Sequence, residues 1–137
     1  MILKATQTNL KEIKHIDCHI PLENLRKCVE DGRVYIMLDK KDIVGLLRFG
    51  CFFDAYPFLN LIILKDGYRR RGLGTLLMDK WESDMLRMGY RDVYTSTQAD
   101  EEAQHFYRKR GYMDVGSFIP YGQCVTELIL HKRLQND

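Results

Sequence analysis

The spacing of apolar residues along the chain alternates between the two-residue period of a strand and the 3.6-residue period of a helix. In the first half, strand-like runs cover residues 2–6, 34–38 and 43–53, and helical stripes cover residues 9–16 and 22–30. The polar segment 39–42 predicts a hairpin turn between two of these strands. A nearly unbroken apolar run follows at 58–64, and it predicts a buried strand.

The second half of the chain is predicted to begin with a helix that ends near Met88, where Gly89 supplies a left-handed stop. Its apolar face comprises Leu73, Leu76, Leu77, Trp81 and Met85. A strand at 91–97, a helix from an N-cap at Asp100 to Gly111, and strands at 112–119 and 125–130 complete the chain. The predicted order is therefore β-α-α-β-β-β-α-β-α-β-β, a mixed α/β (α+β) fold.

Length and composition favour one soluble globular domain that spans residues 1–137, because 45% of the residues are hydrophobic and 29% are charged. The net charge of +2 disfavours a nucleic-acid partner, which requires a stronger and more concentrated positive charge. Lys4 interrupts the first apolar residues, and no run of about eighteen apolar residues follows. We therefore expect a cytoplasmic protein with no membrane partner.

The cysteines and histidines give no metal-binding spacing. Cys18, Cys28, Cys51 and Cys124 lie far apart, so we expect reduced, partly buried thiols. The segment 8–32 also holds His15, Asp17, His19 and Glu23, but no periodicity places these four on one face. We expect them to be solvated side chains and predict no metal site.

The segment Arg69-Arg70-Arg71-Gly72-Leu73-Gly74-Thr75 lies between the buried strand and the following helix. The first N–H groups of a helix lack intrahelical acceptors and attract anions, so this strand, turn and helix predict a phosphate-binding site. No lysine precedes Thr75, which excludes a nucleoside-triphosphate loop, and the third glycine of a dinucleotide fingerprint is replaced by Leu77. The motif alone leaves open a solvated loop without a ligand.

Two motifs together resemble the GNAT superfamily of N-acetyltransferases over nearly the full chain. The first, Arg-x-x-Gly-x-Gly after a strand, resembles its acyl-CoA pyrophosphate signature. The second lies at residues 100–112 and resembles Asn-x-x-Ala-x-x-Phe-Tyr-x-x-x-Gly-Phe/Tyr, with matches at Ala103, Phe106, Tyr107, Gly111 and Tyr112. The resemblance implies an acyl-CoA N-acyltransferase fold, with a mostly antiparallel central sheet of about seven strands and about four helices.

The resemblance also implies roles for individual residues. The strand at 58–64 would splay from the strand at 91–97, and pantetheine would lie along the backbone of Ile62, Ile63 and Leu64. The N–H group near Leu64 would bind the oxyanion, and Tyr107 would act as general acid toward the CoA sulfur. The implied cofactor-binding residues are Ile62, Ile63, Leu64, Arg69, Arg70, Arg71, Gly72, Leu73, Gly74, Thr75, Asp100, Ala103, Phe106 and Tyr107.

The chain departs from the family pattern at two positions. Asn60 occupies a position where many relatives carry a glutamate base, and an amide holds a water but takes no proton. Asp100 replaces an asparagine, so it lacks the donor for a pantetheine carbonyl. Three other residues could in principle act as the base, but their expected positions do not favour it. We expect Asp54 to form a turn, Glu127 to be half-exposed and His105 to face solvent. The resemblance therefore implies deprotonation through ordered water, or an acceptor that arrives as a neutral amine.

These features lead to one principal prediction and its alternatives. The principal one is transfer of an acetyl group from acetyl-CoA, without a metal, to a primary amine of a small molecule or peptide. The acceptor site would involve residues 15–32, 52–57 and 117–124, and family habit suggests a homodimer. A non-catalytic acyl-CoA sensor is a second reading, which Asn60 permits. RNA binding through Arg69–Arg71 is disfavoured by the small net charge.

Overall fold

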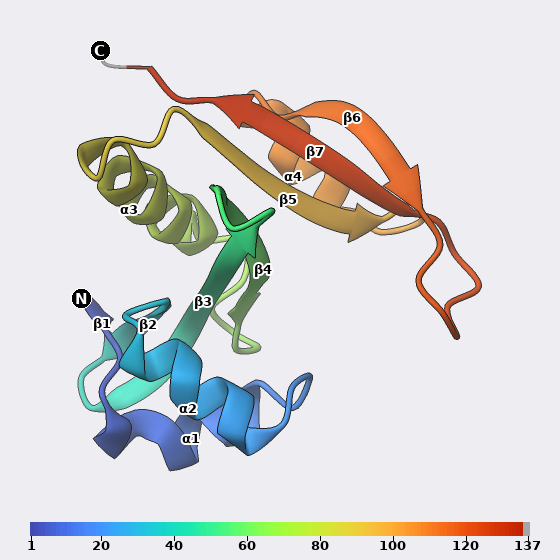
Figure 1. Ribbon diagram of the computed structural model, residues 1–137. Coiled ribbons are helices and arrows are strands. Elements are labelled where there is room, and N and C mark those ends of the chain that lie inside the picture. The colour runs from blue at the N-terminus through green and yellow to red at the C-terminus, as the bar shows by residue number, and fades with distance from the viewer. Residues whose placement is uncertain (136–137) are drawn as a thin grey trace. The chain divides into compact units, whose positions relative to one another are not determined.

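The computed structural model describes residues 1–135 and confirms the predicted order of strands and helices (Figure 1). The strands are β1 (Ile2–Lys4), β2 (Val34–Asp39), β3 (Asp42–Phe52), β4 (Tyr56–Leu64), β5 (Asp92–Gln98), β6 (Met113–Phe118) and β7 (Glu127–Arg133). The helices are α1 (Leu10–Ile16), α2 (Leu22–Glu30), α3 (Leu73–Arg87) and α4 (Ala103–Lys109), with a 3₁₀ turn at Gln7–Asn9. The seven strands follow the order β1-β2-β3-β4-β5-β7-β6; the β4–β5 pair is parallel, whereas the β1–β2, β2–β3, β5–β7 and β6–β7 pairs are antiparallel. The predicted fold class, a mostly antiparallel seven-stranded sheet with four helices, is thus confirmed.

The start of α4 differs from the prediction. The helix begins at Ala103, and Asp100 is an exposed turn residue rather than its N-cap. The side-chain amide of Gln104 donates to the carbonyls of Ala99 and Glu101, at 2.8 Å each, and so satisfies the turn that precedes the helix. Because these contacts close the turn from the helix side, the helix begins two residues later than an N-cap at Asp100 predicts.

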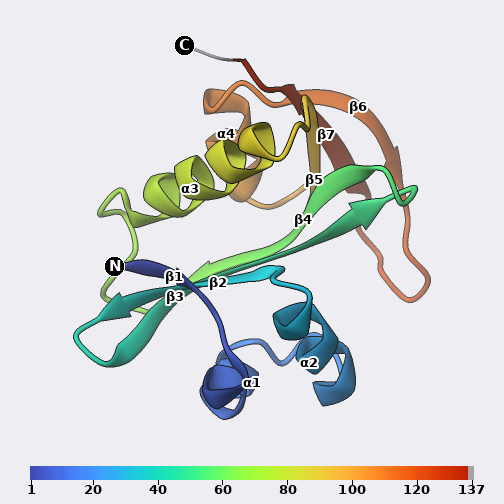
Figure 2. The ribbon, with the colours of Figure 1, turned by 60° about the vertical axis from the view of Figure 1, so that its left-hand side comes forward.

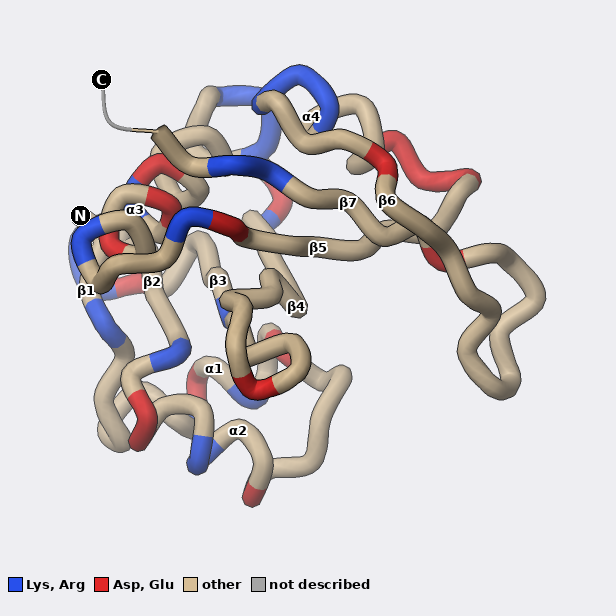
Figure 3. The backbone as a smooth tube through the Cα atoms, turned by 45° about the horizontal axis from the view of Figure 1, so that its top comes forward, with Lys and Arg blue, Asp and Glu red and all other residues tan. Residues whose placement is uncertain are grey.

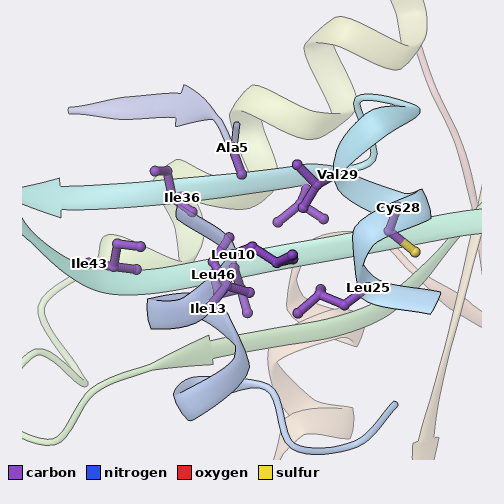
Figure 4. Close-up of a cluster of buried hydrophobic side chains, with 10 residues drawn as sticks. Ala5, Leu10, Ile13, Leu25, Cys28, Val29, Ile36, Ile43 and Leu46 are labelled. Atoms are coloured by element: carbon purple, nitrogen blue, oxygen red, sulfur yellow. The ribbon is translucent and has the colours of Figure 1, made fainter. Parts of the chain in front are cut away.

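The chain divides into two compact units, which share elements β3, β4 and α3. The first unit comprises residues 1–50 and 60–83. In it, α1 and α2 lie on one face of β1, β2 and β3, and the start of α3 lies on the other (Figure 2). Helix α2 is strongly amphipathic and buries Leu25, Cys28 and Val29. These side chains meet Ile13 of α1 and the strand residues Ile36, Ile43 and Leu46 in one apolar core (Figure 4).

Aromatic packing fills the opposite face of β2 and β3. The rings of Tyr35 and Phe49 stack at 6.2 Å, and Phe49 meets the buried Trp81 of α3 at 5.8 Å. Gly45 lies beneath the same helix, and a Cβ built there would lie 2.8 Å from Leu64 Cδ2. The absence of a side chain at Gly45 therefore lets Leu64 pack directly on β3.

The second unit comprises residues 51–59 and 84–135 of the described chain. Strand β5 alternates buried Val93, Thr95 and Thr97 with half-buried residues, as expected for a strand with one covered face. The charged start of β5 lies beside the basic end of β7 (Figure 3). There Asp92 contacts His131 at 2.8 Å and Arg133 at 2.7 Å, and these ion pairs connect the two strands.

The cysteines are more exposed than the sequence predicts. All four cysteines are free thiols, but only Cys28 is buried, so the expectation of partial burial is wrong for Cys18, Cys51 and Cys124. The wide spacing of the cysteines in the sequence argues against a metal motif, but it does not predict whether each thiol is buried. Within residues 1–135, every helix is too short or too polar to cross a bilayer.

Candidate functional site

The glycine turn forms the predicted strand-turn-helix junction. Helix α3 begins at Leu73, and its first hydrogen bond joins the N–H of Leu76 to the carbonyl of Gly72 at 3.3 Å. The N–H groups of Leu73, Gly74 and Thr75 consequently lie in the first turn, where the helix offers no acceptor. Arg70 and Gly72 both have left-handed backbone conformations, with φ of +60° and +77°. Such left-handed residues direct successive N–H groups to one concave side, which suits an anion.

The arginine side chains have structural contacts within the same loop. Arg69 Nε donates to the carbonyl of Leu64 at 3.3 Å, and its guanidinium lies 3.5 Å from Asp66. The Arg71 guanidinium lies 5.2 Å from the ring centre of Tyr68 and donates to the carbonyl of Gly67. A Cβ at Gly72, in contrast, would have no neighbour within 4 Å. The open side of the loop is therefore its backbone at Gly72, while two of the three arginines brace it.

Strand β4 contributes residues to both compact units. Phe58 and Leu59 pair in parallel with Tyr94 and Thr95 of β5. At the other end of the strand, Ile62, Ile63 and Leu64 are half-buried. The resemblance assigns the backbone N–H and carbonyl groups of these three residues to pantetheine and to the oxyanion.

Asn60 is exposed and lies over a glycine of the neighbouring strand. A Cβ built on Gly50 would lie 2.9 Å from Asn60 Nδ2 and 3.7 Å from Arg33 Nη1. The guanidinium of Arg33 also donates to the carbonyl of Phe49 at 3.1 Å and to Asp31 at 3.1 Å. Asn60 thus has polar surroundings, which suit an amide that orients a water.

Tyr107 lies in α4 of the second unit and is 5% exposed. Its ring contacts those of Phe106 and Tyr112 at centroid distances of 5.5 and 5.6 Å. Burial raises the pKa of the Tyr107 phenol to about 12, although a hydrogen bond with Thr95 opposes this rise. Thr95 itself donates to the carbonyl of Leu59 at 3.1 Å. The phenol is therefore fully protonated at neutral pH and is a donor, not a base.

The remaining candidate residues differ in how far they are exposed to solvent. Asp100 is exposed, whereas Ala103 and Phe106 are half-buried on α4. The side chain of His105 is 65% exposed, which confirms that it faces solvent. Asp54 occupies the β3–β4 turn with φ of +57°, and the half-buried Glu127 accepts a hydrogen bond from Gln123 at 3.1 Å, so both expectations hold.

One charged cluster was not predicted. Asp17 is fully buried, and its carboxylate accepts a 2.6 Å hydrogen bond from Arg48 Nε of β3. The expectation that Asp17 is solvated is therefore wrong, because a buried guanidinium compensates its charge. Their separation of 31 residues left no local signal. In residues 1–135, no three His, Cys, Asp or Glu side chains form a group suited to a metal ion.

Residues 30–114 match the family model described as "Acetyltransferase (GNAT) domain", whereas no curated protein matches the sequence. A GNAT-family acetyltransferase from Bacillus cereus ATCC 10987 is 26% identical, with a TM-score of 0.80 and coverage of 99% of this chain and 98% of that one. The ribosomal-protein-S18-alanine N-acetyltransferase of Escherichia coli is 15% identical, with a TM-score of 0.84 and coverage of 100% and 95%.

The yncA protein of Salmonella typhimurium, a putative acetyltransferase whose structure contains acetyl-CoA, has the same fold. It is 13% identical, with a TM-score of 0.83 and coverage of 100% of this chain and 95% of that one. The family model covers well over half of the chain, and the observed topology agrees with these structures. The chain therefore belongs to the GNAT acetyltransferase family.

Proposed function

We propose that the protein is an N-acetyltransferase that moves an acetyl group from acetyl-CoA to a primary amine by direct attack in a ternary complex. The observation that carries this proposal is the junction at Gly72, where left-handed backbone and the first turn of α3 present N–H groups to one open side. Family membership supports the reaction class. The acetyl-CoA of the yncA structure and the coenzyme A of the Thermoplasma acidophilum paia structure support the donor.

The backbone of the first unit would bind the donor. The N–H groups of Arg70–Thr75 would hold the pyrophosphate, and the edge of Ile62–Leu64 would pair with pantetheine. An N–H near Leu64 would stabilise the oxyanion that forms when the amine attacks the thioester, since a positioned donor acts on charge as it develops. Arg69 and Arg71 would contribute charge and loop geometry. These assignments require no metal.

Residues of α4 would serve the leaving group. Tyr107 would act as the acid that assists departure of the CoA sulfur, while Asp100, Ala103 and Phe106 would flank the cofactor. The carboxylate of Asp100 accepts hydrogen bonds but donates none. Asn60 would hold a water on the acceptor side. We further propose that residues 1–137 form one functional domain in the cytoplasm, with acetyl-CoA and an amine as partners, and that two copies form a homodimer.

The test compares two variants of the glycine turn. A side chain at Gly72 demands a left-handed conformation that costs a β-branched residue well over about 1 kcal/mol, and its Cβ extends into the open side of the loop. We expect Gly72→Val to weaken acetyl-CoA binding at least tenfold in calorimetric titration, and Arg70→Ala to weaken it less than threefold. Equal losses would show that arginine charge, and not the helix start, holds the phosphates.

Turnover distinguishes an enzyme from the acyl-CoA sensor that Asn60 permits. Release of free CoA is measured with acetyl-CoA and a panel of alkyl, aromatic and peptide amines. An amine-dependent release above the rate of thioester hydrolysis supports the transferase. Acetyl-CoA binding without amine-dependent release on any member of the panel would instead support the sensor.

A further inference from the structure

The buried carboxylate of Asp17 also holds a histidine. Asp17 Oδ1 lies 3.2 Å from His19 Nδ1 and accepts the backbone N–H of His19 at 3.2 Å. Asp17 Oδ2 accepts the 2.6 Å bond from Arg48 Nε. The Asp17 side chain is fully buried, whereas the His19 side chain is 56% exposed. A carboxylate fixed by a buried guanidinium thus holds one edge of an imidazole that is open to solvent.

This arrangement defines the chemistry of the imidazole. Although burial alone would raise the pKa of the Asp17 carboxyl, hydrogen bonds and charge from Arg48, together with hydrogen bonds from His19, lower it overall. Asp17 is therefore ionised at neutral pH and accepts the Nδ1–H of His19. The neutral ring then carries its lone pair on Nε2, the state required of a base. An ionised partner also stabilises the imidazolium that forms when Nε2 takes a proton.

Strand β3 connects this pair to Asn60. Arg48 and Gly50 are two residues apart on β3, so they share one face of the strand at a spacing of about 7 Å. Arg48 reaches Asp17 on that face, and Gly50 lies against the side chain of Asn60. All of these residues belong to the first compact unit. Arg48, which holds the Asp17–His19 pair, therefore lies two residues from Gly50, which contacts Asn60 at the position where the resemblance implies a base.

We propose that His19 is the catalytic base that removes a proton from the ammonium of the acceptor, with Asp17 as its positioning residue. This inference rests on the proposed acetyl transfer. His19 Nε2 takes one proton from the ammonium, and the free amine attacks the acetyl carbonyl and forms the C–N bond. The C–S bond then breaks, and its electron pair leaves with sulfur. The nitrogen loses its second proton to water as the amide forms, and the thiolate gains one proton, so the protons balance. The imidazolium finally releases its proton to water.

The charged side chains that flank His19 have partners of their own. Asp17 and Arg48 are mutually paired. Lys14 of α1 donates to the carbonyl of Ile20 at 2.7 Å, and on α2 Glu23 pairs with Arg26 at 3.3 Å. A base of this kind predicts an acidic limb in kcat/KM, because the imidazolium cannot accept a proton.

The experiment uses His19→Asn, because an asparagine amide retains a donor for Asp17 but removes Nε2. We expect kcat/KM for an alkyl amine to fall about 10²- to 10⁴-fold at pH 7, the usual contribution of a positioned base. The dissociation constant of acetyl-CoA should stay within twofold. The defect should also shrink as pH approaches the amine's own pKa of about 10, where the free amine needs no base. A variant whose activity fell because its fold was disturbed would not regain activity at high pH.

The matched control is His105→Asn, which removes an exposed histidine from the other unit and should leave the pH profile unchanged. A His19→Asn enzyme that keeps more than a third of wild-type kcat/KM and the same acidic limb would overturn the assignment. So would a defect that stays constant up to pH 10. Wild-type protein that binds acetyl-CoA but acetylates no amine would refute the proposed function itself, which distinguishes the two failures.

Discussion

The raised pKa of Tyr107 limits what this residue contributes to catalysis. At a pKa of about 12, only about one phenol in a thousand is ionised at pH 9. Full proton transfer to a thiolate of pKa about 8.5, the cysteine value, is then uphill by about 5 kcal/mol, because each pKa unit corresponds to about 1.4 kcal/mol. We therefore expect Tyr107 to stabilise the departing sulfur as a hydrogen-bond donor, and the thiolate to take its proton from water.

The perturbation that measures this contribution is Tyr107→Phe, which removes the hydroxyl and preserves the ring contacts with Phe106 and Tyr112. A hydrogen bond to a charged group is worth about 1.5–3 kcal/mol, so the expected loss in kcat is roughly 10- to 150-fold. Since Tyr107 stays protonated across the working range, the ratio of wild-type to variant rates should be constant from pH 7 to pH 10.

Two assays check this expectation. Steady-state rates with saturating acetyl-CoA give the ratio at each pH, and phenolate absorbance of the wild-type minus the variant protein reports the ionisation of this one tyrosine among eight. An alkaline limb with a midpoint below about pH 10.5 that disappears in Tyr107→Phe would refute the reasoning. A difference absorbance that develops below pH 10 would refute it independently.

Two further predictions concern stability and are measured by denaturant unfolding. Asp17→Asn leaves Arg48 buried without its counter-charge and should cost about 3–5 kcal/mol at pH 7. Since the folded state lowers the pKa of Asp17, this stabilisation is present above the unfolded pKa of about 4 and is lost as pH falls through the folded value. The gap between the two proteins should therefore narrow below about pH 4, and a constant gap would contradict the assignment. Gly45→Ala should cost about 1–3 kcal/mol by overpacking against Leu64, whereas Gly116→Ala, with no neighbour within 4 Å, should be close to neutral; equal effects would contradict the packing.

The features that the sequence predicted well are those encoded locally. The strand, glycine turn and helix around Gly72 are adjacent in the chain, so a short motif specifies them together with the outward N–H groups. The glycine stop at Gly89 is equally local, and its φ of +98° confirms a left-handed helix end. Short-range periodicity was therefore sufficient for the element order and for the strand-turn-helix junction at Gly72.

The features that escaped prediction depend on contacts between distant residues. The sequence predicts a solvated Asp17, because its partner Arg48 lies 31 residues away on a strand and leaves no local signal. The prediction of an N-cap at Asp100 is wrong because the side chain of Gln104 binds the carbonyl of Glu101 in the preceding turn. A capping pattern does not show which of two such local hydrogen-bonding arrangements forms. The high pKa of Tyr107 follows from tertiary burial, which the residue type alone does not reveal.

The left-handed conformation of Arg70 has a consequence for the thermodynamics of ligand binding. A side chain at φ of +60° costs roughly 1 kcal/mol or more relative to glycine, and the protein bears this cost before any ligand arrives. The bracing of the loop by Arg69 and Arg71 offsets part of it. The concave row of N–H groups is consequently preorganised, so an incoming anion loses little affinity to ordering of the loop. Arg70→Gly would remove this strain and stabilise the free protein. It would also make the free loop more flexible, so anion binding would cost more conformational entropy.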